Sequence, residues 1–199
     1  MKKTDAQHDP LASIMLAEGV YTAHVVGFEV REDWQTKVGV ADIFSLQYKL
    51  APDVEKLSQE CYRRGINGTF AVGEDGKRIP ILDDEGNTLR ISCKQFTGRK
   101  LYANGLFLFK GAAGSGRNSK YAEFLDNIGV KLEEVDVDGH KVKQLLAIEE
   151  EDVMGKALLV QVAYKANKKG DFYPTVVDTL KWADGKPISI EEAMDDLPF

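Results

Sequence analysis

Residues 20–50 read VYTAHVVGFEVREDWQTKVGVADIFSLQYKL, which is two alternating runs separated by a polar stretch. Side chains in residues 20–30 alternate with a period of two, and residues 38–50 repeat the pattern with Asp42 as the exception. Successive side chains of a strand point to opposite faces, so each run predicts a strand. The stretch between them, REDWQTK at residues 31–37, predicts a polar loop with one large aromatic residue, Trp34.

Shorter strand-like segments follow along the chain. Residues 89–96 and 101–109 are rich in aliphatic and aromatic side chains. Residues 158–164 and 173–182 predict a closing hairpin, joined by the loop ANKKGD at residues 166–171. Residues 51–88 are less regular, and their Gly and Asp residues predict turns and an inserted hairpin region.

One helix is predicted near residues 119–128. Asn118 or Ser119 can cap its start, and Gly129 suits its C-terminal end. The apolar residues that recur at helical spacing are Tyr121, Phe124, Leu125 and Ile128.

Many short strands with one central helix predict a mainly β protein built as a small barrel. The OB fold is a five-stranded Greek-key barrel of this kind, which binds nucleic acid across strands two and three and through two loops. With residues 20–50 as the first hairpin and 158–182 as the last, those loops are residues 31–37 and 165–171. We therefore expect an OB-fold-like domain over residues 1–185, with 51–88 as an insertion and 186–199 as a flexible acidic tail.

The charge of the chain is unevenly distributed. The net charge is −6, yet residues 88–122 hold seven basic residues and no acidic one, and residues 123–155 reverse the excess. Such segregation permits a basic track for nucleic acid on an acidic protein. The sequence shows no secretory signal and no membrane-spanning run, and Cys61 and Cys93 form no Cys-x-x-Cys pair. We therefore expect a cytoplasmic protein with reduced thiols and no membrane partner.

The chain ends in acids followed by a Leu-Pro-Phe tip. An apolar pocket can take the Phe ring while basic residues meet the acids, so the segment has the character of a peptide ligand. It is similar to the acidic tip of bacterial and phage single-stranded DNA-binding proteins. The order of the hairpins and the strand start GKAL at residues 155–158 also resemble the phage members of that family. The tip residues are Asp195, Asp196, Leu197, Pro198 and Phe199.

The resemblance implies sequence-independent binding of single-stranded DNA in phage DNA replication or recombination, protection of that strand, and recruitment of replication proteins through the tip. Such binding needs cations along the phosphates and flat side chains that stack on bases. The expected cations are Arg31, Lys37, Lys94, Arg99, Lys100, Lys165, Lys168 and Lys169. The expected aromatic contacts are Trp34, Tyr48, Phe96, Tyr102, Phe172 and Tyr173. Binding-site size, oligomeric state and the use of RNA stay open.

Little in the sequence indicates an enzyme. The glycine-rich residues 111–116 are followed by Arg117 and Asn118, which do not fit a phosphate-binding loop. We expect no catalytic residues, no metal and no cofactor. Two other interpretations remain: an interaction module whose tip imitates a host tail without DNA binding, and a metal-dependent nuclease built on the acidic residues 149–152.

Overall fold

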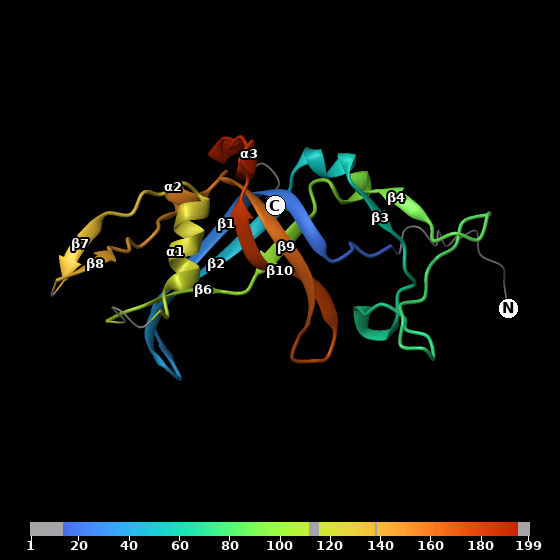
Figure 1. The fold of residues 1–199 in the computed structure, drawn as a ribbon, viewed down its shortest axis with the longest axis horizontal. Coiled ribbons are helices and arrows are strands. Elements are labelled where there is room, and N and C mark those ends of the chain that lie inside the picture. Colours follow the sequence, from blue (N-terminus) through green and yellow to red (C-terminus); the bar gives the residue numbers. More distant parts are fainter. Residues whose placement is uncertain (1–13, 112–115, 138, 195–199) are drawn as a thin grey trace.

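The computed structural model describes residues 14–111, 116–137 and 139–194, and it is mainly β (Figure 1). Its largest sheet in the described ranges has six strands, in the order β1-β9-β10-β5-β2-β6 with a further pairing of β1 with β2. The strands of this sheet are β1 (Gly19–Thr36), β2 (Gly39–Leu50), β5 (Lys100–Ala103), β6 (Leu106–Phe109), β9 (Ala157–Ala166) and β10 (Phe172–Lys181).

The pairings around this sheet form a cycle. Strand β1 is antiparallel to both β2 and β9, β9 is antiparallel to β10, and β2 is antiparallel to both β5 and β6. A parallel pairing of β10 with β5, through Thr175 with Tyr102 and Val176 with Ala103, joins the two halves. The last hairpin therefore lies between β1, which pairs with β9, and β5, which pairs with β10.

The alternation in β2 explains its position. Its even-numbered side chains from Asp42 to Leu50 are buried, whereas Ile43, Ser45, Gln47 and Lys49 are only partly covered. The even-numbered face therefore lines the core, in which Phe44, Leu158 and Val160 are almost wholly excluded from solvent. Burial of a whole face of this strand fixes its register, because a slip of one residue would expose every core side chain.

The predicted loop at residues 31–37 is wrong. Strand β1 continues to Thr36 and β2 begins at Gly39, so only Lys37 and Val38 turn the chain. Residues 29–35 are all exposed, and backbone pairing with β2 rather than burial keeps them extended. The first hairpin is therefore a long arm that projects beyond the core (Figure 1).

Asp42, the exception in the alternating pattern, stabilises this arm. A bulge in β1 puts Asp33 at a φ of 52°, and its backbone N–H donates to Oδ1 of Asp42 at 2.9 Å. Lys110 Nζ lies 2.6 Å from Asp33 Oδ1 and 3.0 Å from Asp42 Oδ1, and these two hydrogen bonds raise the pKa of Lys110. The carboxylate of Asp42 thus satisfies a backbone donor that the ladder leaves unpaired.

The predicted helix is present as α1 (Ser119–Asn127) and packs on the core. Tyr121 is fully buried, with its ring centroid 5.4 Å from that of Phe44, and its hydroxyl donates to the carbonyl of Leu146. Asn118 occupies the N-cap position, but its side chain does not cap the helix. Instead, its amide both donates to and accepts from the backbone of Phe109, which fastens the start of α1 to β6.

The segment between β2 and β5, residues 51–99, is an ordered insertion rather than a part of the large sheet. A ladder of backbone bonds, including those from Arg63 N to Ile79 O and from Ile79 N to Ala71 O, holds its turns together. Gln59 ties it to the body through the carbonyl of Met15. Its elements are η2 (Pro52–Lys56), β3 (Ser58–Glu60), η3 (Ile66–Gly68), β4 (Arg90–Ser92) and η4 (Cys93–Phe96).

The remaining elements belong to the C-terminal half of the sequence. They are the hairpin of β7 (Glu134–Val137) and β8 (His140–Lys143), and the short helices α2 (Glu150–Val153) and α3 (Ile190–Met194). Within the described residues, none of the helices has the length and apolar character needed to cross a membrane.

Residues 186–194 differ from the flexible tail that we expected. Nε2 of His24 lies 3.0 Å from the carbonyl oxygen of Lys186, and the N–H of Ile188 donates to the carbonyl of Gly155. Helix α3 packs on β1 and buries Ala193. The body of the protein therefore extends to Met194, and residues 195–199 lie outside the described residues.

Candidate nucleic-acid interface

The odd-numbered side chains of β2 and their cross-strand partners form one face of the sheet, here called the outer face. Residues directly opposite each other on antiparallel strands point to the same side. Ile43 pairs with Arg31 on β1 and with Phe107 on β6, so these three side chains share the outer face. Gln47 pairs in the same way with Tyr102 on β5. The outer face is therefore built from β1, β2, β5 and β6.

Exposed aromatic rings concentrate on this face. Ala41 pairs with Trp34 on one side and with Phe109 on the other. The rings of Phe107 and Phe109 stack with centroids 5.9 Å apart and an interplanar angle of 14°. Trp34, Tyr102 and Phe107 are 51%, 61% and 37% exposed. Burial cannot explain rings this exposed, whereas stacking on nucleic-acid bases can use them.

Basic side chains accompany these rings. Lys49 pairs with Lys100 across β2 and β5, and Arg31 lies beside Ile43 on the arm. On the last hairpin, Lys165 pairs with Tyr173. Thr175 of β10 pairs with Tyr102 of β5, so these two side chains point to the same side. The residues two positions earlier, Tyr173 and Lys100, point to that side as well, because side chains alternate along a strand. The outer face therefore continues from β5 onto β10 and, through the pair of Tyr173 with Lys165, onto β9. Glu29, opposite Ser45, adds an acidic group to this surface.

The turn of the β9–β10 hairpin is held by one side chain. Oδ1 of Asn167 accepts the backbone N–H groups of Lys169 and Asp171, and Gly170 adopts a φ of 85°. Lys168 and Lys169 are exposed at the tip. The β1–β2 arm, with Lys37 at its end, and this hairpin both project toward the lower edge of Figure 1. The arm and the β9–β10 hairpin therefore project from the same side of the sheet in this view.

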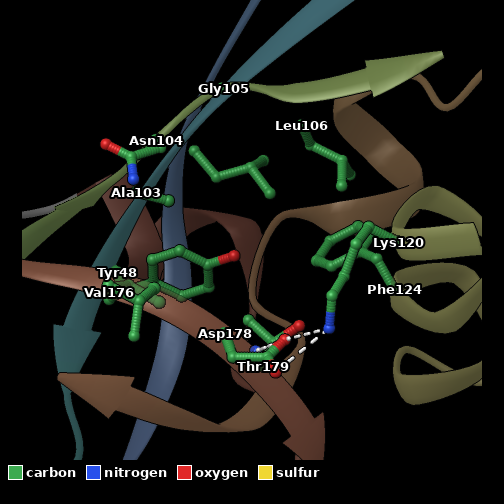
Figure 2. Close-up of a pocket in the computed structure, with 12 residues that line it drawn as sticks. Tyr48, Ala103, Asn104, Gly105, Leu106, Lys120, Phe124, Val176, Asp178 and Thr179 are labelled. Atoms are coloured by element: carbon green, nitrogen blue, oxygen red, sulfur yellow. Dashed lines mark hydrogen bonds and ion pairs between the residues drawn. The ribbon is translucent and has the colours of Figure 1, made fainter. Parts of the chain in front are cut away.

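Two of the predicted aromatic contacts are wrong because the rings are buried. Tyr48 is 1% exposed and belongs to the core face of β2. Figure 2 shows its ring beside Val176, in a pocket of about 150 Å³ near an ion pair between Lys120 and Asp178. Phe96 is 4% exposed, and the guanidinium carbon of Arg99 lies 5.7 Å from its ring centroid. Phe96 therefore supports Arg99 and cannot stack on a base.

A pocket of about 380 Å³ brings together other predicted residues. It lies between the insertion and the last hairpin, and Arg99, Phe172 and Tyr173 line it. Phe172 and Tyr173 are 39% and 40% exposed. Arg64 of the insertion lines the same pocket, although its position in the sequence gave no sign of it. Lys94, in contrast, is exposed on η4 and does not line this pocket.

Sequence reasoning missed Phe107, Phe109 and Lys49 as well as Arg64. In the segment LFLF at residues 106–109 every side chain is apolar, so hydrophobic alternation does not reveal which face is exposed. Lys49 could have been found, since it occupies an outward position in a clearly alternating strand. The predicted tip residues 195–199 lie outside the described residues, so the structure does not report on them.

Asp152 and His24 have structural roles. Asp152 accepts the backbone N–H of Glu149 in a capping box that starts α2. His24 is buried, and its ring lies 5.9 Å from that of Trp182. Within the described ranges, no group of three or more His, Cys, Asp or Glu side chains is arranged to hold a metal ion.

Comparison of the chain with known protein families and with curated protein sequences gave no match.

Proposed function

We propose that this protein binds single-stranded DNA without sequence preference through its outer face. The observation that carries the proposal is the row of Trp34, Phe107 and Tyr102, exposed on one face beside Arg31 and Lys100. Each base stacked on an aromatic ring contributes about 1–3 kcal/mol, and every base has a flat face to offer. Duplex DNA hides those faces within its stack, so exposed rings favour a single strand.

The strand order supports an OB fold. The cyclic pairing β1–β2–β5–β10–β9–β1, with α1 between the third and fourth strands in the chain, has the connectivity of this five-stranded barrel. In OB folds the second and third strands and the loops of the first and last hairpins bind oligonucleotides. The corresponding parts here are β2 with β5 and β6, the β1–β2 arm and the β9–β10 turn, which carry the exposed rings and cations.

The proposed role is in phage DNA replication or recombination, in the cytoplasm of the host cell. The protein covers the exposed strand, and the tip at residues 195–199 recruits replication proteins. The tip follows directly on Met194, which lines a pocket of about 370 Å³ together with Gln47 and Tyr102. This attachment point supports a second role for the acids of the tip, in which they compete with DNA for the outer face.

Intrinsic fluorescence tests DNA binding. The two tryptophans are Trp34 on the arm and Trp182, which follows β10 and contacts His24. We expect single-stranded DNA to quench the fluorescence, duplex to do so far less, and Trp34→Phe to remove most of the signal. The matched variant Trp182→Phe should keep the signal. If single strands caused no quenching and a mobility assay also showed no complex, the proposal would fail. The interaction module whose tip imitates a host tail would then become the better account.

Truncation tests the division of labour between the face and the tip. Because α3 packs on β1, the chain should be cut after Met194 and no earlier. We expect the truncated protein to bind DNA equally or more tightly and to lose its capture of replication proteins. A large loss of DNA affinity would contradict competition between the tip and DNA.

A further inference from the structure

The insertion contributes a surface that the proposed function does not yet use. Its η3 turn lies against β10, where Gly68 adopts a φ of 75° and a Cβ at this position would collide with the carbonyl oxygen of Phe172. Only glycine allows the two backbones to come this close. The turn itself is closed by a bond from Gly65 N to Thr69 O at 2.7 Å. The insertion is therefore seated on the last hairpin in a defined position.

The contact forms one side of an open pocket of about 380 Å³, which is lined by Arg64, Arg99, Phe172 and Tyr173. This volume falls in the range of small-ligand sites, roughly 300–1,000 Å³. The pocket is lined by two guanidinium groups and no carboxylate, and within the described part of the chain neither Arg64 nor Arg99 forms an ion pair. Two arginines gathered without an acid favour an anion as the occupant.

Both arginines also act on a tyrosine in the pocket wall. Burial raises the pKa of Tyr164, while the nearby charges of Arg99 and Arg64 act in the opposite direction. The Tyr164 hydroxyl donates to the carbonyl of Leu16 at 2.9 Å, and its ring packs edge-on against Phe70 at 5.3 Å between centroids. Tyr164 is thus a fixed wall, and the half-exposed rings of Phe172 and Tyr173 are the ones offered to a ligand.

We propose that this pocket is a second subsite for single-stranded DNA, in which Arg64 and Arg99 hold a phosphate while Phe172 or Tyr173 stacks on the adjoining base. The inference rests on the proposed function and extends it to the insertion. Arg99 directly precedes Lys100, and Tyr173 belongs both to the outer face and to the pocket lining, so the pocket adjoins that face. The insertion thereby lengthens the surface along which the protein contacts single-stranded DNA.

Arg64→Ala tests the subsite, and Arg63→Ala is the matched control. Both arginines are exposed neighbours of equal charge, but only Arg64 lines the pocket. The assay is fluorescence anisotropy with labelled oligothymidines from about 4 to about 20 nucleotides long. For the longer strands we expect Arg64→Ala to weaken binding about threefold to tenfold and to lower the salt slope by about 0.7, the value of one phosphate contact. The shortest strands should bind as they do to the wild type.

The outcomes separate this inference from the proposed function. If the wild type binds no single strand of any length, the proposed function fails. If the wild type binds but Arg64→Ala and Arg63→Ala behave alike, or Arg64→Ala weakens all lengths equally, the subsite is refuted and the function stands. If the effect of Arg64→Ala disappears once the chain is cut after Met194, the pocket holds the acidic tip rather than DNA. Gly68→Ala, which should displace the insertion from the hairpin, is expected to reproduce the length-dependent loss, and normal binding of long strands by this variant would overturn the inference.

Discussion

Two tyrosines on neighbouring strands offer a sharp test of the face assignment. Tyr48 pairs with Leu101, and the next pair along is Gln47 with Tyr102, so the two phenol rings point to opposite sides of the sheet. Tyr48 is 1% exposed and Tyr102 is 61% exposed. Replacing each by alanine should therefore affect different properties: the stability of the protein for Tyr48 and the affinity for DNA for Tyr102.

The magnitudes follow from burial. Loss of one stacked base costs about 1–3 kcal/mol, and about 1.4 kcal/mol corresponds to a factor of ten, so Tyr102→Ala should weaken DNA binding about 5- to 150-fold. Its effect on the free energy of unfolding should stay within about 0.5 kcal/mol, as for other surface changes. Tyr48→Ala removes a buried aromatic ring and should cost about 3–5 kcal/mol of stability. In a chain of this size that lowers the Tm by roughly 6–20 °C.

The assay combines anisotropy titration of a labelled single strand with thermal unfolding followed by circular dichroism. Tyr102→Phe is the control, because it keeps the ring and should keep the affinity. A change in affinity of less than about twofold for Tyr102→Ala would refute the stacking role of this residue. An equal fall in Tm for Tyr102→Ala and Tyr48→Ala would refute the assignment of the two faces.

Three further predictions concern charge and the thiols. DNA affinity should fall steeply with salt, and Lys165→Ala should lower the slope of log K against log salt concentration by about 0.7; an unchanged slope would exclude a phosphate contact. A hydrogen bond from Arg78 lowers the pKa of Glu18, so the stability from this pair is present above the ordinary pKa and is lost as the pH falls through the folded-state value. Urea unfolding from neutral pH to about 3 should show a smaller loss for Glu18→Gln, and parallel curves for the two proteins would contradict this. Burial raises the pKa of Cys61 and Cys93, so the native protein should react slowly with a thiol reagent at neutral pH and rapidly in urea, whereas fast native labelling would argue against their burial.

Local patterns predicted the main elements well. The alternation in residues 38–50 gave the strand β2 and its core face, and helical spacing gave α1. Both signals come from neighbouring side chains that share one buried face, which is a property of the sequence itself. The mainly β class is confirmed for the same reason, since several such strands follow one another along the chain.

The same reasoning failed where burial does not hold the element in place. Residues 31–36 looked like a loop because they are polar, yet they continue β1 through backbone pairing with β2 rather than through burial. Residues 186–194 looked like a tail, but contacts with Gly155 and His24 hold their first part against the body. The arm pairs with nearby residues 39–43, but its exposed polar side chains gave no alternation that marked it as a strand. The partners of Lys186 and Ile188 are distant in the sequence, so no local pattern indicated that they are held against the body.

The sequence by itself determined a chain of short strands that carries many cations and aromatic rings, from which most of the proposed DNA contacts were chosen. Only the tertiary structure decided which of these residues are exposed and lie close to one another. It buried Tyr48 and Phe96, exposed Phe107, and brought Arg64 beside Arg99 from a segment whose purpose the sequence did not reveal. The physical reason is that one face of a strand becomes buried and the other stays exposed only when the sheet and the insertion pack together. Exposure and proximity are therefore properties of pairing between distant segments, whereas composition and periodicity belong to each segment alone.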